Sequence, residues 1–295
     1  MKHLLSDFDW QPQQLQSLLQ LAATVKQFPA DYARALEGKS VALLFEKPSL
    51  RTRVTFELGV QQLGAHVVYL DQQHGALGKR EPVADFASNL SCWVDAIVAR
   101  TFSQATIDEL AATGSASVIN ALSDRFHPCQ GLADMLSLFE IFGKLDGIKL
   151  GYVGDGNNVS HSLMLLAKLL GVQMTVVTPE GFAPDADITA ASGAKVSHDL
   201  KMLEGVDAIY TDTWISMGDD ADPAAIKASF SPYQVNEALM QATGAKAVMH
   251  CLPAYRGLEV SAEVIDGPQS QILRQAENRL HVQKALLLTL LKESN

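Results

Sequence analysis

Short apolar runs alternate with segments of helical periodicity along the first half of the chain. Four runs predict buried strands, at 41–45, 67–70, 95–99 and 117–121. Between them, apolar residues recur at a spacing typical of amphipathic helices. Alternation of strand and helix predicts a parallel sheet with helices on its faces. Ligands of such sheets bind outside the carboxyl ends of the strands.

A second alternating unit follows a polar, glycine-bounded segment, 143–147. Its strands are predicted at 148–153, 173–178, 207–211 and 247–250. The apolar segment 270–291 predicts a long C-terminal helix, which needs a groove, most simply on the first unit. We therefore expect an α/β fold of two domains, each with a central parallel sheet flanked by helices, and a C-terminal helix returning to the first domain. The predicted boundaries are 1–143 with 270–295, and 144–269.

Composition narrows the functional classes. The chain has 295 residues, of which 47% are hydrophobic, so two cores of ordinary size are expected. A formal net charge of -10 argues against a nucleic-acid partner, because phosphate backbones need a basic surface. Three widely spaced cysteines, the lack of a signal-peptide core and the lack of a membrane-length apolar run predict a soluble cytoplasmic protein.

The segment 45–64 is the strongest candidate for a binding site. After the first predicted strand, a turn at Pro48 leads into a helix that begins near Ser49. Backbone N–H groups at a helix N-terminus attract anions. The hydroxyls of Ser49 and Thr52 and the guanidinium groups of Arg51 and Arg53 add donors suited to phosphate. The alternative is a capped helix with solvated arginines.

Two further segments bring donors to strand or helix ends. Arg100 follows its predicted strand, at the edge of the sheet where Arg51 also lies. His127 and Gln130 flank Pro128 at the start of a helix and are expected to point outward, as donors for a carbonyl oxygen. A structural histidine is the alternative for His127. Arg279 lies within the C-terminal helix.

The second unit offers acceptors instead. Asp212 and Ser216 follow a predicted strand and suit a cationic ligand, although a capping aspartate and a loop serine are common. Asn158 ends the glycine-containing turn 154–158, which only loosely matches a dinucleotide-binding turn. Cys251 ends another strand and is a candidate for direct chemistry or an inert buried thiol. An anion-binding set and an amine-binding set together suggest transfer from an acyl-phosphate-like donor to an amine. The sequence shows no Walker lysine or metal-ligand cluster.

Six motifs in order give the chain a family resemblance. They are Ser49–Arg53, His127–Gln130, Gly154–Asn158, Asp212–Gly218, His250–Pro253 and Ala276–His281. The chain resembles the aspartate/ornithine carbamoyltransferase family, over nearly its whole length. The Ser-Met-Gly of 216–218 and the His-Cys-Leu-Pro of 250–253 favour the ornithine branch.

The resemblance implies roles for these positions. It implies that carbamoyl phosphate is bound by Ser49, Leu50, Arg51, Thr52, Arg100, His127, Gln130, Cys251, Leu252 and Arg279. It implies that ornithine is bound by Asn158, Asp212, Ser216 and Met217. Arg100, His127 and Cys251 would be the catalytic residues. The implied product is citrulline, with no metal or organic cofactor, and the implied assembly is a homotrimer in which a neighbour's loop completes each site.

Two departures from the family pattern keep alternatives open. Leu50 stands where the family has threonine, and Ala76 stands where the neighbour-donated loop has glutamine. Both changes affect the carbamoyl phosphate site. Leucine at this position also resembles carbamoyltransferases that act on N-acylated ornithine, but the intact Ser-Met-Gly of 216–218 keeps free ornithine as the preferred acceptor. A non-catalytic ligand-binding member is a further alternative. The glycines near Gly154 motivate a nucleotide-dependent enzyme as a third.

Overall fold

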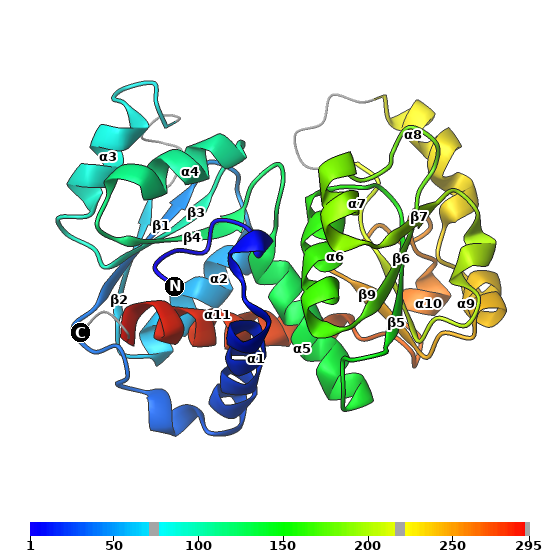
Figure 1. The fold of residues 1–295 in the computed structure, drawn as a ribbon, viewed down its shortest axis with the longest axis horizontal. Helices are drawn as coiled ribbons and strands as arrows, with labels where there is room; N and C mark the ends of the chain where they lie inside the picture. Colours follow the sequence, from blue (N-terminus) through cyan, green and yellow to red (C-terminus); the bar gives the residue numbers. More distant parts are fainter. Residues whose placement is uncertain (71–76, 216–221, 293–295) are drawn as a thin grey trace. The chain divides into compact units, whose positions relative to one another are not determined.

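The computed structural model describes residues 1–70, 77–215 and 222–292. The chain divides into two compact units (Figure 1). Unit 1 comprises Met1–Leu136 and Asn278–Asn295, and unit 2 comprises Ser137–Glu277. The division falls inside two helices, whereas the predicted boundaries lie at 143 and 270. The assignment of binding roles to the two predicted domains stays a prediction.

Unit 1 contains a four-stranded parallel sheet with the order β2-β1-β3-β4. Its strands are β1 (Ser40–Phe45), β2 (His66–Leu70), β3 (Ala96–Arg100) and β4 (Ser117–Leu122). All four were predicted to within two residues at each end. The chain moves from β1 outward to β2 and then crosses to β3 on the other side. The carboxyl ends of β1 and β3 therefore form the switch point at which ligands bind in such sheets.

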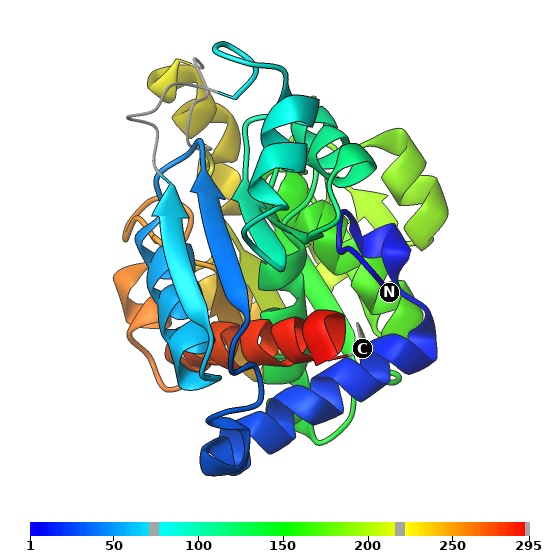
Figure 2. The ribbon, with the colours of Figure 1, turned by 90° about the vertical axis from the view of Figure 1, so that its left-hand side faces the viewer.

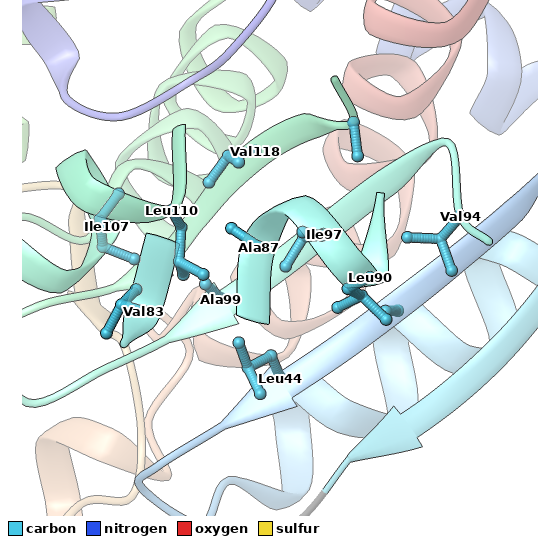
Figure 3. Close-up of a cluster of buried hydrophobic side chains, with 12 residues drawn as sticks. Leu44, Val83, Ala87, Leu90, Val94, Ile97, Ala99, Ile107, Leu110 and Val118 are labelled. Carbon is cyan, nitrogen blue, oxygen red and sulfur yellow. The ribbon is translucent and has the colours of Figure 1, made fainter. Parts of the chain in front are cut away.

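Helices cover the sheet of unit 1. They are α1 (Pro12–Gln27), α2 (Leu50–Gln62), α3 (Val83–Leu90), α4 (Gln104–Thr113), α5 (Pro128–Phe142) and α11 (Ile272–Lys292), with short 3-10 turns at Asp7–Asp9 and Pro29–Tyr32. Figure 3 shows the core under α3 and α4, where Ala87 and Leu110 meet Ile97 and Val118 of the strands. Burial of these apolar side chains on one helix face stabilises the unit.

The C-terminal helix packs on the first unit, as predicted. Lys26 of α1 donates a hydrogen bond to the Asn278 side chain (2.8 Å), and Lys284 donates one to the Gln62 side chain of α2 (3.1 Å). Gly59 permits this approach, because a Cβ there would lie 3.3 Å from the Lys284 side chain. Figure 2 shows α11 beside α1. Burial lowers the pKa of Lys284.

Unit 2 contains a five-stranded parallel sheet with the order β7-β6-β5-β8-β9. Its strands are β5 (Lys149–Val153), β6 (Gln173–Val177), β7 (Lys195–Ser197), β8 (Ala208–Thr211) and β9 (Ala247–His250). The short edge strand β7 was not predicted, since three partly exposed residues give no apolar run. The switch point here lies between β5 and β8.

The helices of unit 2 are mostly short. They are α6 (Asn158–Leu170), α7 (Ala186–Ser192), α8 (Pro223–Phe230), α9 (Glu237–Thr243) and α10 (Ala262–Ile265), with 3-10 turns at Leu200–Leu203 and Ser231–Tyr233. Within the described ranges, none of the helices combines the length and apolar content that crossing a bilayer requires.

Candidate active site

The turn after β1 builds a candidate anion site in unit 1. Ser49 is the N-cap of α2, and its hydroxyl accepts a hydrogen bond from the Thr52 N–H (3.3 Å). Glu46 is buried and accepts one from the Phe102 N–H (3.1 Å), which ties the segment after β1 to the segment after β3. The helix N-terminus is thereby held at the switch point of the sheet, with the positive end of its dipole toward that edge.

Arg279 joins three helices of unit 1. Its guanidinium donates to the Thr52 hydroxyl of α2 (2.6 Å) and to the Gln130 side-chain oxygen of α5 (2.8 Å). Arg279 is only 4% exposed. A buried charge is costly unless it is hydrogen-bonded, and these two partners are neutral. Both partners accept a hydrogen bond without contributing a charge of their own, which suits a guanidinium that is to face an anion.

Asp134 continues this network and was not identified from sequence. Its carboxylate accepts a hydrogen bond from the Gln130 amide nitrogen (2.8 Å), which leaves the Gln130 oxygen for Arg279. Asp134 lies one helical turn after Gln130, so the two side chains share a face of α5. The spacing of four residues between Gln130 and Asp134 was the one feature of the sequence that pointed to this contact. An aspartate four residues from a glutamine is too common a pattern to identify a site.

Arg100 and His127 lie in the same electrostatic environment as Arg279. Arg100 ends β3 and His127 immediately precedes α5, and both side chains are about 95% buried. Burial, followed by the charges of Arg279 and Arg100, holds the pKa of His127 well below its usual value. The imidazole is therefore neutral at physiological pH, with one donor and one acceptor nitrogen.

Two expectations about the candidate anion site of unit 1 were wrong. His127 and Gln130 do not point outward, and the Gln130 side chain is fully buried.

Arg53 was expected to face an anion beside Arg51. Instead it forms an ion pair with Glu57 (2.8 Å) and lies over the Tyr69 ring, 3.7 Å from its centroid. The hydrogen bond to Glu57 raises the pKa of Arg53. Arg53 pairs with Glu57 because residues four positions apart lie on the same face of a helix. Arg51 is half-buried and Leu50 is 75% exposed.

A candidate amine site lies in unit 2, at the carboxyl ends of β5 and β8. Gly156 is required by close packing, since a Cβ there would approach the Pro184 nitrogen to within 2.2 Å. Its N–H also donates to the Phe182 carbonyl (2.9 Å). A neighbouring segment of protein thus accounts for this glycine. Asn157 then caps α6, and Asn158 is the first residue of that helix.

Asp212 follows β8 and is 6% exposed. One carboxylate oxygen accepts hydrogen bonds from the Thr213 N–H (2.7 Å) and the Cys251 thiol (2.8 Å). The other accepts one from the Asn157 side-chain amide (3.0 Å). These donors are neutral, so the carboxylate keeps its negative charge for a cationic ligand. Ser216 and Met217, predicted beside Asp212, lie outside the described residues, as does Ala76.

A buried pair orders the loop that carries Cys251 and Leu252. The Leu252 N–H donates to Nδ1 of His250 (2.8 Å), so Nε2 carries the proton and donates to Glu259 (3.1 Å). His250 and Glu259 are each 1% exposed. Leu252 has φ +62°, a left-handed conformation that costs about 1–3 kcal/mol outside glycine and persists where the surroundings enforce it. Glu259 was not identified from sequence, since it lies eight residues beyond Cys251.

Asp212, His250 and Cys251 are also the candidate metal ligands among the described residues. Their ligand atoms lie within 4.8 Å of one another. However, both ring nitrogens of His250 are engaged, and the Cys251 thiol already donates to Asp212. The arrangement fits a hydrogen-bonded network that holds a carboxylate better than an open set of metal ligands.

Comparison with known proteins gives matches along the whole chain. Residues 2–140 match the carbamoyl-P binding domain of aspartate/ornithine carbamoyltransferases, and residues 146–290 match their Asp/Orn binding domain. An ornithine carbamoyltransferase of Shewanella oneidensis is 58% identical, covering 98% of this chain and 99% of that protein. One from a Vibrio strain is 52% identical, covering 99% of this chain and all of that protein.

Solved structures of ornithine carbamoyltransferases align with this chain over its whole length. The ornithine carbamoyltransferase from Pyrococcus furiosus aligns with a TM-score of 0.94 at 42% identity, covering 100% of this chain and 98% of that chain. That from Thermus thermophilus aligns with a TM-score of 0.91 at 45% identity, covering 99% of both chains. Both family domains are matched and the fold aligns over the whole length, so the chain belongs to the aspartate/ornithine carbamoyltransferase family.

Proposed function

We propose that this protein transfers the carbamoyl group of carbamoyl phosphate to the side-chain amine of L-ornithine, giving L-citrulline and phosphate. Full-length identity of 52–58% to ornithine carbamoyltransferases is the observation that carries this conclusion. The two charged sites supply its physical basis. Arg279 offers a buried positive charge for a phosphate, and Asp212 offers a buried negative charge for an amino acid.

We assign carbamoyl phosphate to the residues of unit 1. Ser49, Leu50, Arg51 and Thr52 bind the phosphate through the N-terminus of α2 and their side chains. Arg279 completes the anion site. The support is the hydrogen bond from Arg279 to Thr52 and the capped helix N-terminus. The corresponding domain spans 1–143, with 270–295 packing on it.

Arg100, His127 and Gln130 hold the carbamoyl carbonyl oxygen. A neutral His127 donates one hydrogen bond, and the Arg100 charge stabilises the oxyanion that forms when the amine attacks. Preorganised donors of this kind supply the largest single stabilisation in many acyl transfers. The low pKa of His127 supports a neutral donor at this position.

The residues of unit 2 bind ornithine. Asn158, Asp212, Ser216 and Met217 hold the amino acid, and Cys251 and Leu252 line the reacting centre. The corresponding domain is 144–269. The neutral side-chain amine attacks the carbonyl carbon, a C–N bond forms, and the C–O bond to phosphate breaks. Phosphate leaves with the bonding electron pair and takes up the proton that the amine loses. The residues alone supply this chemistry, so we propose no metal or organic cofactor.

We further propose a homotrimer in the cytoplasm. Leu50, Val54 and Leu58 recur every four residues on α2, and each is more than 40% exposed. Val68, on the edge strand β2, is 49% exposed. An exposed apolar stripe beside an open sheet edge suits contact with another copy. None of the three cysteines forms a disulfide with another, in keeping with a reducing compartment.

A citrulline assay with several amine acceptors tests the proposal. Purified protein with carbamoyl phosphate is expected to carbamoylate ornithine in preference to N-acetylornithine or N-succinylornithine. Leu50 is the feature that favours an N-acylated acceptor, so Leu50→Thr serves as the matched variant. Turnover of an N-acylated acceptor alone would refute the acceptor assignment. Absence of turnover with every acceptor would refute the activity, and sedimentation analysis would report the trimer separately.

A further inference from the structure

The Asn157 side chain connects Asp212 to the start of α6, which carries Asn158; these are two of the four residues of unit 2 that we assign to ornithine. Its oxygen accepts hydrogen bonds from the N–H groups of Val159 (3.0 Å) and Ser160 (3.2 Å), which caps α6. Its amide nitrogen donates to Asp212 (3.0 Å). The oxygen must face the two N–H groups and the nitrogen must face the carboxylate, so the amide has one satisfactory orientation.

Capping alone does not require asparagine. Serine, aspartate and asparagine cap helices about equally well. Only the amide of asparagine presents an acceptor to the helix and a donor to a carboxylate from the same position. The residue type at 157 is therefore explained by the contact with Asp212 as well as by the start of α6.

The surroundings of Asn157 fix its position further. The Tyr152 hydroxyl donates to the Asp155 carbonyl (2.9 Å) and lies 3.4 Å from the Asn157 side-chain oxygen. Tyr152 is fully buried and stacks on Tyr210, 5.8 Å between ring centroids. Burial, with Asp212 next in effect, raises the pKa of Tyr152, so its hydroxyl remains a donor.

We infer that Asn157 is a positioning residue for ornithine: it orients the Asp212 carboxylate and fixes the helix start that carries Asn158. The inference rests on the proposed function for the identity of the ligand. Asn157 need not touch ornithine itself. It acts through Asp212, whose second oxygen it holds while Thr213 and Cys251 hold the first.

Two substitutions separate capping from positioning. Asn157→Ser keeps a capping oxygen but cannot donate to Asp212. Asn157→Asp keeps the cap and places a second carboxylate against Asp212. Asn236→Ser is the matched control, because Asn236 caps α9 of the same unit through one hydrogen bond to Leu239 N–H (3.1 Å).

Steady-state kinetics with each substrate varied give the first readout. Asn157→Ser is expected to raise KM for ornithine about 10- to 100-fold, the effect of losing a hydrogen bond to a charged group, while KM for carbamoyl phosphate changes less than about twofold. For Asn157→Asp, the fall of kcat/KM for ornithine at acid pH is expected to begin at higher pH than in the wild type, because two adjacent carboxylates hold a proton more readily than one. Asn236→Ser should change neither. An unchanged ornithine KM in Asn157→Ser, or equal losses for both substrates, would overturn the inference.

Alkylation of Cys251 gives a readout that does not depend on the activity. Weakening the donor set of Asp212 leaves its carboxylate a stronger acceptor for the Cys251 thiol proton. The pH profile of iodoacetamide labelling, followed on the Cys251 peptide by mass spectrometry, should therefore move to higher pH in both Asn157 variants and stay in place in Asn236→Ser. Wild-type protein that makes no citrulline would refute the proposed function, whereas an unmoved labelling profile would refute the positioning role of Asn157.

Discussion

Each unit holds a buried charged side chain among neutral hydrogen-bonding groups, and the two charges have opposite signs. In unit 1, buried Arg279 is held by the neutral groups of Thr52 and Gln130. In unit 2, buried Asp212 is held by an amide, a thiol and a backbone N–H. In each unit, these partners are neutral and do not cancel the charge that they hold in place. A site for a charged ligand needs this combination, because an ion pair with a neighbour would use up the field that attracts the ligand.

The two sites differ in how their parts are brought together. The anion site uses helix side chains separated by up to 227 positions in sequence, as in the Thr52–Arg279 hydrogen bond. The amine site uses strand-end turns whose backbone conformation is itself fixed, as at Leu252. We therefore expect substitutions in unit 1 to act through lost charge, and those in unit 2 to act through lost charge or through relaxation of a loop.

Loss of the central charge of unit 1 should have the largest effect. Arg279→Met is expected to lower kcat/KM for carbamoyl phosphate by about a thousandfold, because preorganised charged donors to a reacting anion contribute at that scale. Arg279→Lys restores a charge but not both hydrogen bonds, so its activity should lie between the two. Steady-state kinetics provide the measurement.

Arg274→Met is the control for this experiment. Arg274 lies on the same helix, is exposed, and contacts Glu140 at 3.7 Å. It should retain wild-type kinetics. A loss of less than about tenfold in correctly folded Arg279→Met would contradict the role of this charge, since a single hydrogen bond to a charged group contributes about that much.

Loss of the central charge of unit 2 should come next. Asp212→Asn keeps the shape of the side chain, but it removes the charge. Both carboxylate oxygens accept from donors, so the new amide nitrogen meets a donor in either orientation, at Asn157 or at Thr213. The expected result is a fall of about a hundredfold in kcat/KM for ornithine, with KM for carbamoyl phosphate nearly unchanged. Asp207→Asn, at the opposite end of β8, is the matched control. Equal losses for both substrates would remove the distinction between the two sites.

The buried pair behind the Cys251 loop should affect stability. Glu259→Ala leaves the N–H groups of buried His250 and of Tyr255 without their acceptor and is expected to destabilise the protein by about 2–3 kcal/mol. Asp266→Ala removes the exposed ion pair with Arg256 and should cost less than about 1 kcal/mol. Chemical denaturation measures both. Similar losses would show that the buried pair does not order this loop.

The smallest expected effect is a pH dependence of stability due to His127. Its folded pKa is well below 6.5, so the unfolded chain takes up a proton near pH 6.5 that the folded protein does not. Stability contributed by neutral His127 is therefore present above pH 6.5 and falls as the pH drops below it, by at most about 1.4 kcal/mol per pH unit. His127→Asn should flatten this part of the stability curve. An unchanged slope would place the titration elsewhere.

Local sequence patterns predicted several strands, one helix start and the family. The apolar runs that became β1, β3 and β9 gave the parallel sheets, because buried strands of such sheets are nearly continuous in apolar residues. The helix start at Ser49 followed from turn and capping chemistry. The ordered series of motifs identified the family. Each of these signals lies within a few residues of the feature that it predicts.

Tertiary structure decided which side chains meet. Arg53 and Arg279 are both arginines on helices, but one is engaged by Glu57 and Tyr69 and the other is buried against Thr52 and Gln130. The inward placement of Gln130, the second function of Asn157 and the pairing of His250 with Glu259 likewise depend on neighbours that only packing supplies. The sequence determined the strands, the helix starts and the residue types that offer charge. The fold decided which charges stay available, because burial and long-range hydrogen bonds depend on groups far away along the chain.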